Sequence, residues 1–185
     1  MIQIKNAAEL AQMRRACEIS AAALKAGGEA IEPGISTAEI DKIIYDFIVR
    51  HGARPNFLHL YGFPATACIS VNDTVIHGIP SRSQKIRPGD IVSIDTGCKI
   101  GGFNGDNACT YACGKVDLEA RRLMEVTKES LHRGIAMAQA GNRIGDISHA
   151  VQSYVEENGF SVVRSFVGHG VGKELHEDPE VPNFG

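Results

Sequence analysis

The sequence predicts an α/β (α+β) fold of two similar halves, in which helices cover one face of a mostly antiparallel sheet. Three observations lead to this prediction. Helical segments occur in pairs, a stretch rich in Gly, Pro, Thr, Val and Ile separates the pairs, and the pairs recur at a fixed offset. The chain has 185 residues, 43% of them hydrophobic, which suits one domain with a sizeable core.

The predicted helices begin at capping residues. Asn6 and Ser36 are each followed three residues later by a glutamate, the pattern of a capping box. The first helix carries an apolar stripe of Leu10, Met13, Cys17, Ile19 and Leu24. Its pattern breaks at Pro33-Gly34, and the other helices are expected over about 37–50, 118–138 (capped by Asp117) and 144–158.

The segment from about 57 to 111 has short apolar runs between turn residues, which is typical of strands. We expect strands at Val75-Ile76 and at Ile91–Ile94, and a further one over 161–166.

An internal repeat links the two helix pairs at an offset of 107 residues. At this offset Arg14-Arg15 falls on Arg121-Arg122, and Gly34 and Gly52 fall on Gly141 and Gly159. Any two amphipathic helices share apolar spacing, but paired glycines and a paired Arg-Arg favour a duplication, with halves 1–107 and 108–185 of one domain. The second copy of the strand region at 91–111 is missing, so we expect a C-terminally truncated chain.

Composition excludes several classes of protein. The net charge is −3 and no long basic run occurs, so we expect no binding to nucleic acid or to an anionic membrane. No apolar stretch approaches the ~20 residues of a membrane span, and the N-terminus does not resemble a signal peptide. The five cysteines contain no C-x-x-C, which favours reduced thiols in the cytoplasm over a zinc knuckle or a disulfide framework.

Two aspartates point to a metal site. Asp95 and Asp106 are 11 residues apart, and a hairpin turning at Ile100-Gly101 would place them directly opposite each other. Two facing carboxylates repel unless a cation lies between them, and a divalent metal is the usual one. In the alternative interpretation, Asp106 is an Asx-turn residue and Asp95 is solvated.

Three histidines add to this signal. His169 lies in Gly-His-Gly-Val-Gly, where backbone can approach closely, His176 follows seven residues later, and His77 precedes Gly78. A lone histidine beside glycine is more often structural, but three of them together with an aspartate pair favour a functional site.

These motifs resemble those of the type I methionine aminopeptidases. The resemblance covers essentially the whole chain and rests on motifs in the order and spacing of that family: Phe63-Pro64, Ser70-Val71-Asn72, His77-Gly-Ile-Pro, the Asp95/Asp106 pair with Gly105-Asp106, Gly168-His-Gly-Val-Gly172 and His176-Glu-Asp-Pro. It implies the two-half "pita-bread" fold.

The resemblance also implies residue roles and cofactors. Two divalent metal ions (Co, Mn, Fe or Zn) would bind at Asp95, Asp106 and His169. His77 and His176 would be the catalytic and substrate-binding histidines near the scissile peptide. Phe63, Cys68 and Leu175 would line a methionine pocket, although many relatives have Phe where this chain has Leu175. Two glutamate ligands of the family would lie beyond Gly185, and the position 107 residues after Asp95 is 202, which agrees.

The expected activity is removal of the N-terminal methionine from nascent polypeptides, at the ribosome in the cytoplasm, by a protein that is a monomer when complete. As given, the chain is expected to have little or no activity, since the glutamates are absent. The alternatives are a metal-free binding module on the same fold, or a proline-directed or creatinase-like hydrolase. Retention of both aspartates and of His77, His169 and His176 argues against the binding module, and His77-Gly-Ile-Pro with Phe63-Pro64 argues against the other hydrolases.

Overall fold

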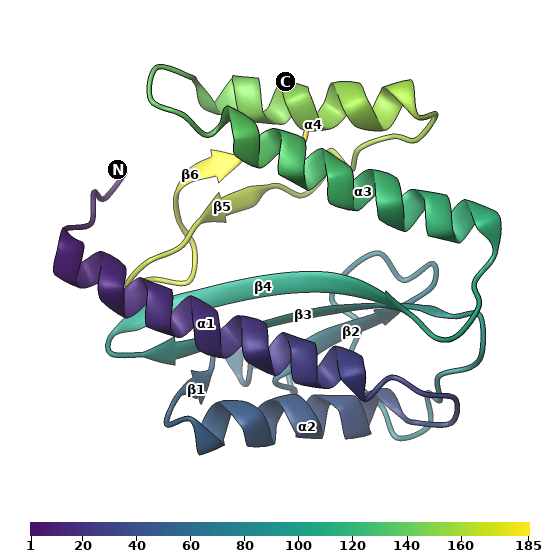
Figure 1. The fold of residues 1–185 in the computed structure, drawn as a ribbon. Coiled ribbons are helices and arrows are strands. Elements are labelled where there is room, and N and C mark those ends of the chain that lie inside the picture. The colour runs from purple at the N-terminus through teal and green to yellow at the C-terminus, as the bar shows by residue number, and fades with distance from the viewer. The chain divides into compact units, whose positions relative to one another are not determined.

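The computed structural model describes residues 1–185 and divides the chain into two compact units (Figure 1). Unit 1 comprises Met1–Gln3, Asp117–Gly170 and His176–Gly185. Unit 2 comprises Ile4–Val116 and Val171–Leu175.

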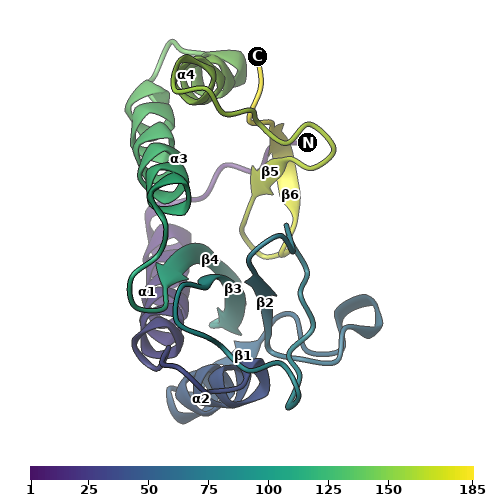
Figure 2. The ribbon, with the colours of Figure 1, turned by 90° about the vertical axis from the view of Figure 1, so that its right-hand side faces the viewer.

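Unit 2 consists of two helices and an antiparallel sheet, with a short 3₁₀ turn. Its elements are α1 (Ala7–Glu29), α2 (Thr37–Arg50), β1 (Arg54–Pro55), η1 (Leu60–Gly62), β2 (Ala67–Val71), β3 (Ile91–Ile100) and β4 (Phe103–Ala112). Strand β3 is central, because β4 pairs along one edge of it while β2 and β1 pair along the other. Helices α1 and α2 pack on the strands, as Figure 2 shows from the side. The predicted fold class is confirmed in this unit.

The two faces of β3 have different neighbours. One face of β3 packs against the helices, and Val92, Ile94, Thr96 and Cys98 on this face are fully buried. The backbone carbonyl of Thr96 accepts a hydrogen bond from Ser20 Oγ of α1 at 3.0 Å. This core face is completed by Ile40, Ile44 and Ile48 of α2 and Ile69 of β2. Since side chains alternate along a strand, the odd-numbered residues of β3 point to the opposite face, away from the helices.

Helix α1 packs on the sheet with small residues rather than with the stripe of large ones that the sequence suggested. Its buried residues are Ala16, Ser20, Ala23, Leu24, Gly27 and Gly28. Of the predicted stripe only Leu24 is buried, and Leu10 is 49% exposed. The reason is the close approach of helix and sheet. A Cβ on Gly105 of β4 would lie 2.5 Å from the carbonyl carbon and oxygen of Ala16, so only small side chains fit between the two elements.

Unit 1 contains a helix pair and a two-stranded ladder. Its elements are α3 (Leu118–Met137), α4 (Ile144–Glu157), β5 (Gly168–Gly170) and β6 (Glu177–Val181). The strands predicted at 161–166 and at Val75-Ile76 do not form. Both segments are largely exposed, and β-branched residues alone do not make a strand when no neighbouring strand offers hydrogen bonds and burial.

The predicted helix starts are confirmed. Asn6 and Ser36 form capping boxes with Glu9 and Glu39, and the Asp117 carboxylate accepts from the backbone N–H of Ala120 at 2.7 Å. These caps depend only on residues three apart in the chain, and local sequence therefore predicts them well.

The two helix pairs share details at the offset of 107 residues. Helices α2 and α4 both have 14 residues. A Cβ on Gly27 would lie 2.7 Å from the side chain of Ile44, and at the equivalent positions of the second pair a Cβ on Gly134 would lie 2.9 Å from the side chain of Val151. These matches support our proposal that residues 1–107 and 108–185 are copies within one catalytic domain.

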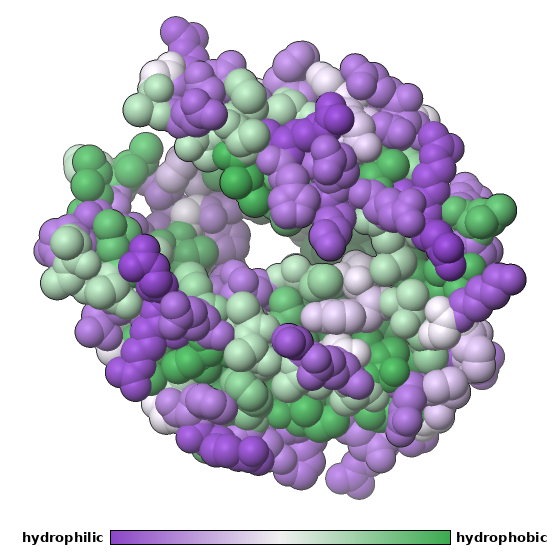
Figure 3. Space-filling model, in the orientation of Figure 1, coloured by the Kyte–Doolittle hydropathy of each residue, from purple (hydrophilic) through white to green (hydrophobic).

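Hydrophilic and hydrophobic side chains are interspersed on the face seen in Figure 3. None of the helices combines the length and the apolar character that crossing a bilayer requires.

Candidate metal centre and substrate site

The aspartate pair lies on the face of β3 and β4 that points away from the helices. Asp95 is directly opposite Ala108, and Asp106 is directly opposite Gly97, so the predicted direct opposition of the two aspartates is wrong. The turn consists of Gly101 and Gly102 rather than Ile100-Gly101, which shifts the register by two residues.

The cause of this shift is the turn chemistry. Gly101 and Gly102 both have positive φ, 59° and 84°, as a two-residue hairpin turn requires, and Gly-Gly is a known signal for such a turn. The shift keeps both carboxylates on one face, as diagonal neighbours, for which ~7–8 Å between Cα atoms is usual. Asp95 and Asp106 therefore still lie on the same face of the sheet despite the shift in register.

Burial and mutual repulsion dominate the electrostatics of this pair. Burial, and then the charge of Asp106, raises the pKa of Asp95 from 3.8 to about 7. The protein alone therefore resists full ionisation of both carboxylates. A divalent cation would supply the missing positive charge, and carboxylate oxygens are ligands that such cations prefer. The donor chemistry of the pair thus fits a metal.

Cys68 lies beside this pair, directly opposite Asp95 on the neighbouring strand β2. Burial, followed by the charges of Asp95, Asp106 and Asp41, raises the pKa of Cys68 to about 12. The thiol is therefore protonated at neutral pH rather than present as the nucleophilic thiolate.

His169 and His176 belong to unit 1 and lie next to each other there. His169 is the middle residue of β5, His176 directly precedes β6, and their ring centroids are 4.4 Å apart in an edge-on arrangement. Nδ1 of His169 lies 2.9 Å from the carbonyl of Gly170 and must donate to it, which leaves the ring lone pair on Nε2. This tautomer is the one that a metal-binding histidine needs.

Gly170, next to His169, allows a close approach of the backbone, as the sequence predicted. A Cβ on Gly170 would lie 2.6 Å from the carbonyl oxygen of Asp178 and 2.9 Å from that of Glu177. Strand β6 can approach this close only to a residue without a side chain.

His77 lies in a loop that folds back onto β2. Its φ is +57°, in the left-handed region, and the next residue, Gly78, accepts from Ile69 N–H at 2.8 Å and donates to Ser70 Oγ at 3.1 Å. A Cβ on Gly78 would lie 2.2 Å from the carbonyl oxygen of Ile69. These contacts fix the backbone on the C-terminal side of His77.

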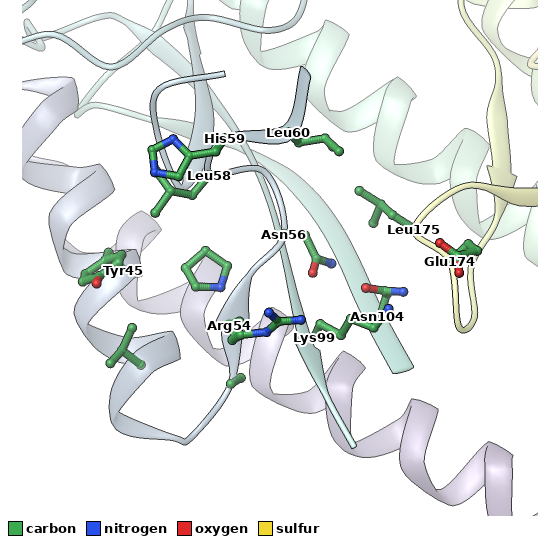
Figure 4. A pocket seen from close by; sticks show the side chains of 13 residues that line it. Tyr45, Arg54, Asn56, Leu58, His59, Leu60, Lys99, Asn104, Glu174 and Leu175 are labelled. Carbon is green, nitrogen blue, oxygen red and sulfur yellow. The ribbon is translucent and has the colours of Figure 1, made fainter. Parts of the chain in front are cut away.

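Within unit 2, a cleft of about 660 Å³ opens beside β1 and the turn around η1 (Figure 4). Leu58, Leu60 and Leu175 supply apolar side chains to it, and Arg54, Lys99 and Glu174 supply charges. Of the three predicted pocket residues only Leu175 lines this cleft, while Phe63 and Cys68 do not.

The segment that carries Leu175 is held in unit 2 by Asn104, a residue that the sequence did not single out. The backbone N–H and the side-chain amide of Asn104 both donate to the carbonyl of Gly172 at 2.9 Å, and the amide also donates to that of Lys173 at 2.9 Å. Lys99 Nζ donates to the Lys173 carbonyl at 2.6 Å. The one feature of the sequence that could have drawn attention to Asn104 is its position two residues before Asp106.

The structure contains no group of three or more His, Cys, Asp or Glu side chains that could hold a metal ion. Asp95 and Asp106 belong to unit 2, and His169 and His176 belong to unit 1.

A family model for the metallopeptidases, family M24, matches residues 11–185. The chain belongs to metallopeptidase family M24. The M24 assignment confirms the resemblance found in the sequence motifs, and it makes divalent metal ions part of the expected chemistry.

Two of the more similar relatives are methionine aminopeptidases. A methionine aminopeptidase of Clostridium perfringens is 52% identical over 185 residues, covering 100% of this chain and 74% of that protein. The crystal structure of a methionine aminopeptidase of Thermotoga maritima superposes with a TM-score of 0.98 at 40% identity, covering 100% of this chain and 74% of that one. A prolidase of Pyrococcus furiosus is more distant, with a TM-score of 0.86 and 25% identity over 98% of this chain and 52% of its own.

Proposed function

We propose that this protein is a methionine aminopeptidase that removes the N-terminal methionine from new polypeptides. The observation that carries the proposal is the identity of 52% along the whole chain to a methionine aminopeptidase. The prolidase reaches only 25%. The aspartate pair, with its need for a cation, gives this assignment a chemical basis.

For the metal centre we propose two divalent ions, of Co, Mn, Fe or Zn, held by Asp95, Asp106 and His169. When bound, such ions activate water and polarise the carbonyl of the scissile peptide bond. The two carboxylates bring negative charge to the site, and Nε2 of His169 brings a neutral donor. Imidazole and carboxylate ligands together suit several transition metals, so the donor set does not choose among them.

His77 and His176 would hydrogen-bond the substrate backbone near the scissile bond. The reaction breaks the peptide bond after the first residue and adds water across it. The new amine needs a proton, and an imidazole can hold or deliver one near neutral pH. The firm backbone contacts of Gly78 would keep His77 in place during this step.

Phe63, Cys68 and Leu175 would line the methionine pocket. Burying a methionine side chain contributes ~1.5–3 kcal/mol, enough to favour it over small or polar residues. The protonated thiol of Cys68 suits such a wall, because a thiol is a small, polarisable and largely apolar group.

The proposed substrate is the N-terminal methionine of a polypeptide leaving the ribosome, and the proposed place is the cytoplasm. We further propose that the complete protein is a monomer. An ion bound to the free amine of the substrate would restrict cleavage to the first residue.

A proline-directed hydrolase is the second candidate, because the prolidase of Pyrococcus furiosus shares the fold. The two activities differ in substrate and can be separated by one assay. The protein expressed from its complete gene is incubated with Mn²⁺ or Co²⁺ and either Met-Ala-Ser or a dipeptide ending in proline.

We expect release of methionine from Met-Ala-Ser, loss of that release with EDTA, and no cleavage of the proline dipeptide. The variant His77→Ala should lose most of the activity, while His132→Ala, which changes an exposed histidine of α3, should not. Cleavage of the proline dipeptide alone would favour the second candidate, and no cleavage of either would count against both.

A further inference from the structure

Three residues form a row across neighbouring strands beside the aspartate pair. Asn56 follows β1, and its backbone N–H donates to the carbonyl of Gly97 at 2.9 Å, continuing the register in which Pro55 pairs with Cys98. On its other side Gly97 pairs with Asp106 of β4. Directly paired residues share a face of the sheet, so Asn56 and Asp106 flank Gly97 on the face that points away from the helices.

The space above Gly97 is where the two polar side chains converge. A Cβ on Gly97 would lie 2.9 Å from the carbonyl oxygen of Gly105, 3.0 Å from Nδ2 of Asn56 and 3.3 Å from Oδ1 of Asp106. Gly97 does not have a positive φ, so its backbone conformation does not call for glycine. The missing side chain instead leaves room for an amide and a carboxylate to approach from opposite sides of β3.

The amide nitrogen of Asn56 is suited to serve this carboxylate. Nδ2 of Asn56 is buried and makes no hydrogen bond in the structure. An amide N–H can only donate and a carboxylate can only accept, so the two groups are complementary. A buried donor also gains more from a charged acceptor than from a neutral one.

We propose that Asn56 is a positioning residue, which orients the Asp106 carboxylate by donating a hydrogen bond to it across Gly97. The inference rests on the proposed metal site. Carboxylates that bind metals are themselves held by hydrogen bonds from outer residues, because a fixed orientation aims the lone pairs at the ion. Asn56 thereby contributes to metal affinity without touching the metal.

Asn107 offers a matched control. Its Nδ2 is also buried without a hydrogen-bond partner, and it is the next residue after Asp106. However, Asn107 pairs with Thr96, on the opposite face of the sheet, which packs against the helices. A change at Asn107 therefore tests the effect of losing a buried amide without affecting the space above Gly97.

The first test measures Mn²⁺ affinity by calorimetry on the protein expressed from its complete gene, for wild type, Asn56→Leu and Asn107→Leu. Leucine keeps the branching of asparagine at Cγ but cannot donate. We expect Asn56→Leu to bind Mn²⁺ about 10–100-fold more weakly, the range for loss of an outer hydrogen bond, with an unchanged melting temperature of the metal-free protein. Asn107→Leu should bind as the wild type does.

Equal affinity in wild type and Asn56→Leu would overturn the inference but leave the proposed function intact. A wild type that binds no Mn²⁺ would instead count against the proposed metal site. The second test uses metal-free protein. It therefore shows whether Asn56 donates to Asp106 whatever the outcome of the Mn²⁺ measurement. The side-chain amide signals of Asn56 in a ¹⁵N spectrum should shift in Asp106→Asn, while those of Asn72, which donates to Asp90 in the same unit, should not. An unmoved Asn56 signal would show that its donor serves another acceptor, such as the carbonyl of Gly105, and would refute the proposal.

Discussion

Replacing Gly105 by alanine tests how closely α1 lies on the sheet. The added Cβ would lie 2.5 Å from the carbonyl carbon and oxygen of Ala16 and 2.6 Å from the backbone nitrogen of Cys17. Ordinary van der Waals contacts begin at 3.4 Å, so helix and strand would have to separate by about 1 Å. No rotamer change can relieve this contact, because all three atoms belong to the helix backbone.

The expected loss follows from two effects. Overpacking a well-packed core by one methyl group destabilises by ~1–3 kcal/mol. Separation would also weaken the hydrogen bond from Ser20 to the Thr96 carbonyl, a contact of 3.0 Å whose loss is worth about 1 kcal/mol. Alanine is less flexible than glycine in the unfolded chain, which favours the folded state by ~0.4–1 kcal/mol and offsets part of the loss. The net expectation for Gly105→Ala is a loss of about 2 kcal/mol, within a range of roughly 1–3.5 kcal/mol.

Urea unfolding followed by circular dichroism measures this loss. With a slope of ~2 kcal/mol per molar, the midpoint should fall by about 1 M while the slope is unchanged. Gly145→Ala in α4 is the control, because a Cβ there meets nothing within 4 Å, and it should be neutral or slightly stabilising. A midpoint for Gly105→Ala equal to that of the wild type would refute the tight packing of α1.

Three further predictions concern a cap, a hydrogen-bonded segment and the thiols. Hydrogen bonds from Ser36 and then from Lys85 lower the pKa of Glu39 from 4.5 to about 2, so its stabilising effect is present above pH 4.5 and is lost as the pH falls towards 2. The difference in urea midpoint between wild type and Glu39→Gln should therefore shrink from pH 7 to pH 2.5, and a constant difference would contradict this. Asn104→Ala should destabilise by ~1–3 kcal/mol and speed hydrogen exchange in residues 171–175, whereas unchanged exchange would show that other contacts hold the segment. A disulfide reagent such as DTNB should label the exposed Cys109 of the native protein first and leave Cys68 unlabelled until the protein unfolds. The reason is that Cys68 is buried and that its thiol has a pKa of about 12. Fast labelling of Cys68 in the native protein would argue against that burial.

Features that depend on nearby residues were predictable from the sequence. The capping boxes at Asn6 and Ser36 are set by residues three apart, and helix ends could be placed from them. That Asp95 and Asp106 share one face of the sheet was also predictable, because a hairpin keeps the two acids on one face whether the register is right or shifted by two residues.

Features that depend on contacts between distant segments were not predictable. The register required the recognition of Gly101-Gly102 as the turn, a signal that was present in the sequence. The sheet-facing side of α1 could not be found from hydrophobicity, because close packing selects Ala, Ser and Gly. Asn56 and Asn104 are ordinary polar residues in the sequence, and only strand pairing and the return of residues 171–175 give them partners.

The interleaving of the two units has a consequence for how the chain acquires its structure. The chain passes from one unit to the other after Gln3, Val116, Gly170 and Leu175. A cut at Val116 would therefore not release two intact pieces, because the first would lack residues 171–175, which Asn104 binds across 68 positions of sequence. During synthesis, the helices and the hairpin can form early, but unit 2 is completed only when Leu175 has left the ribosome. The carbonyls of Gly172 and Lys173, to which Asn104 donates, are therefore synthesised after the helix pair of unit 1, and the completion of unit 2 waits for them.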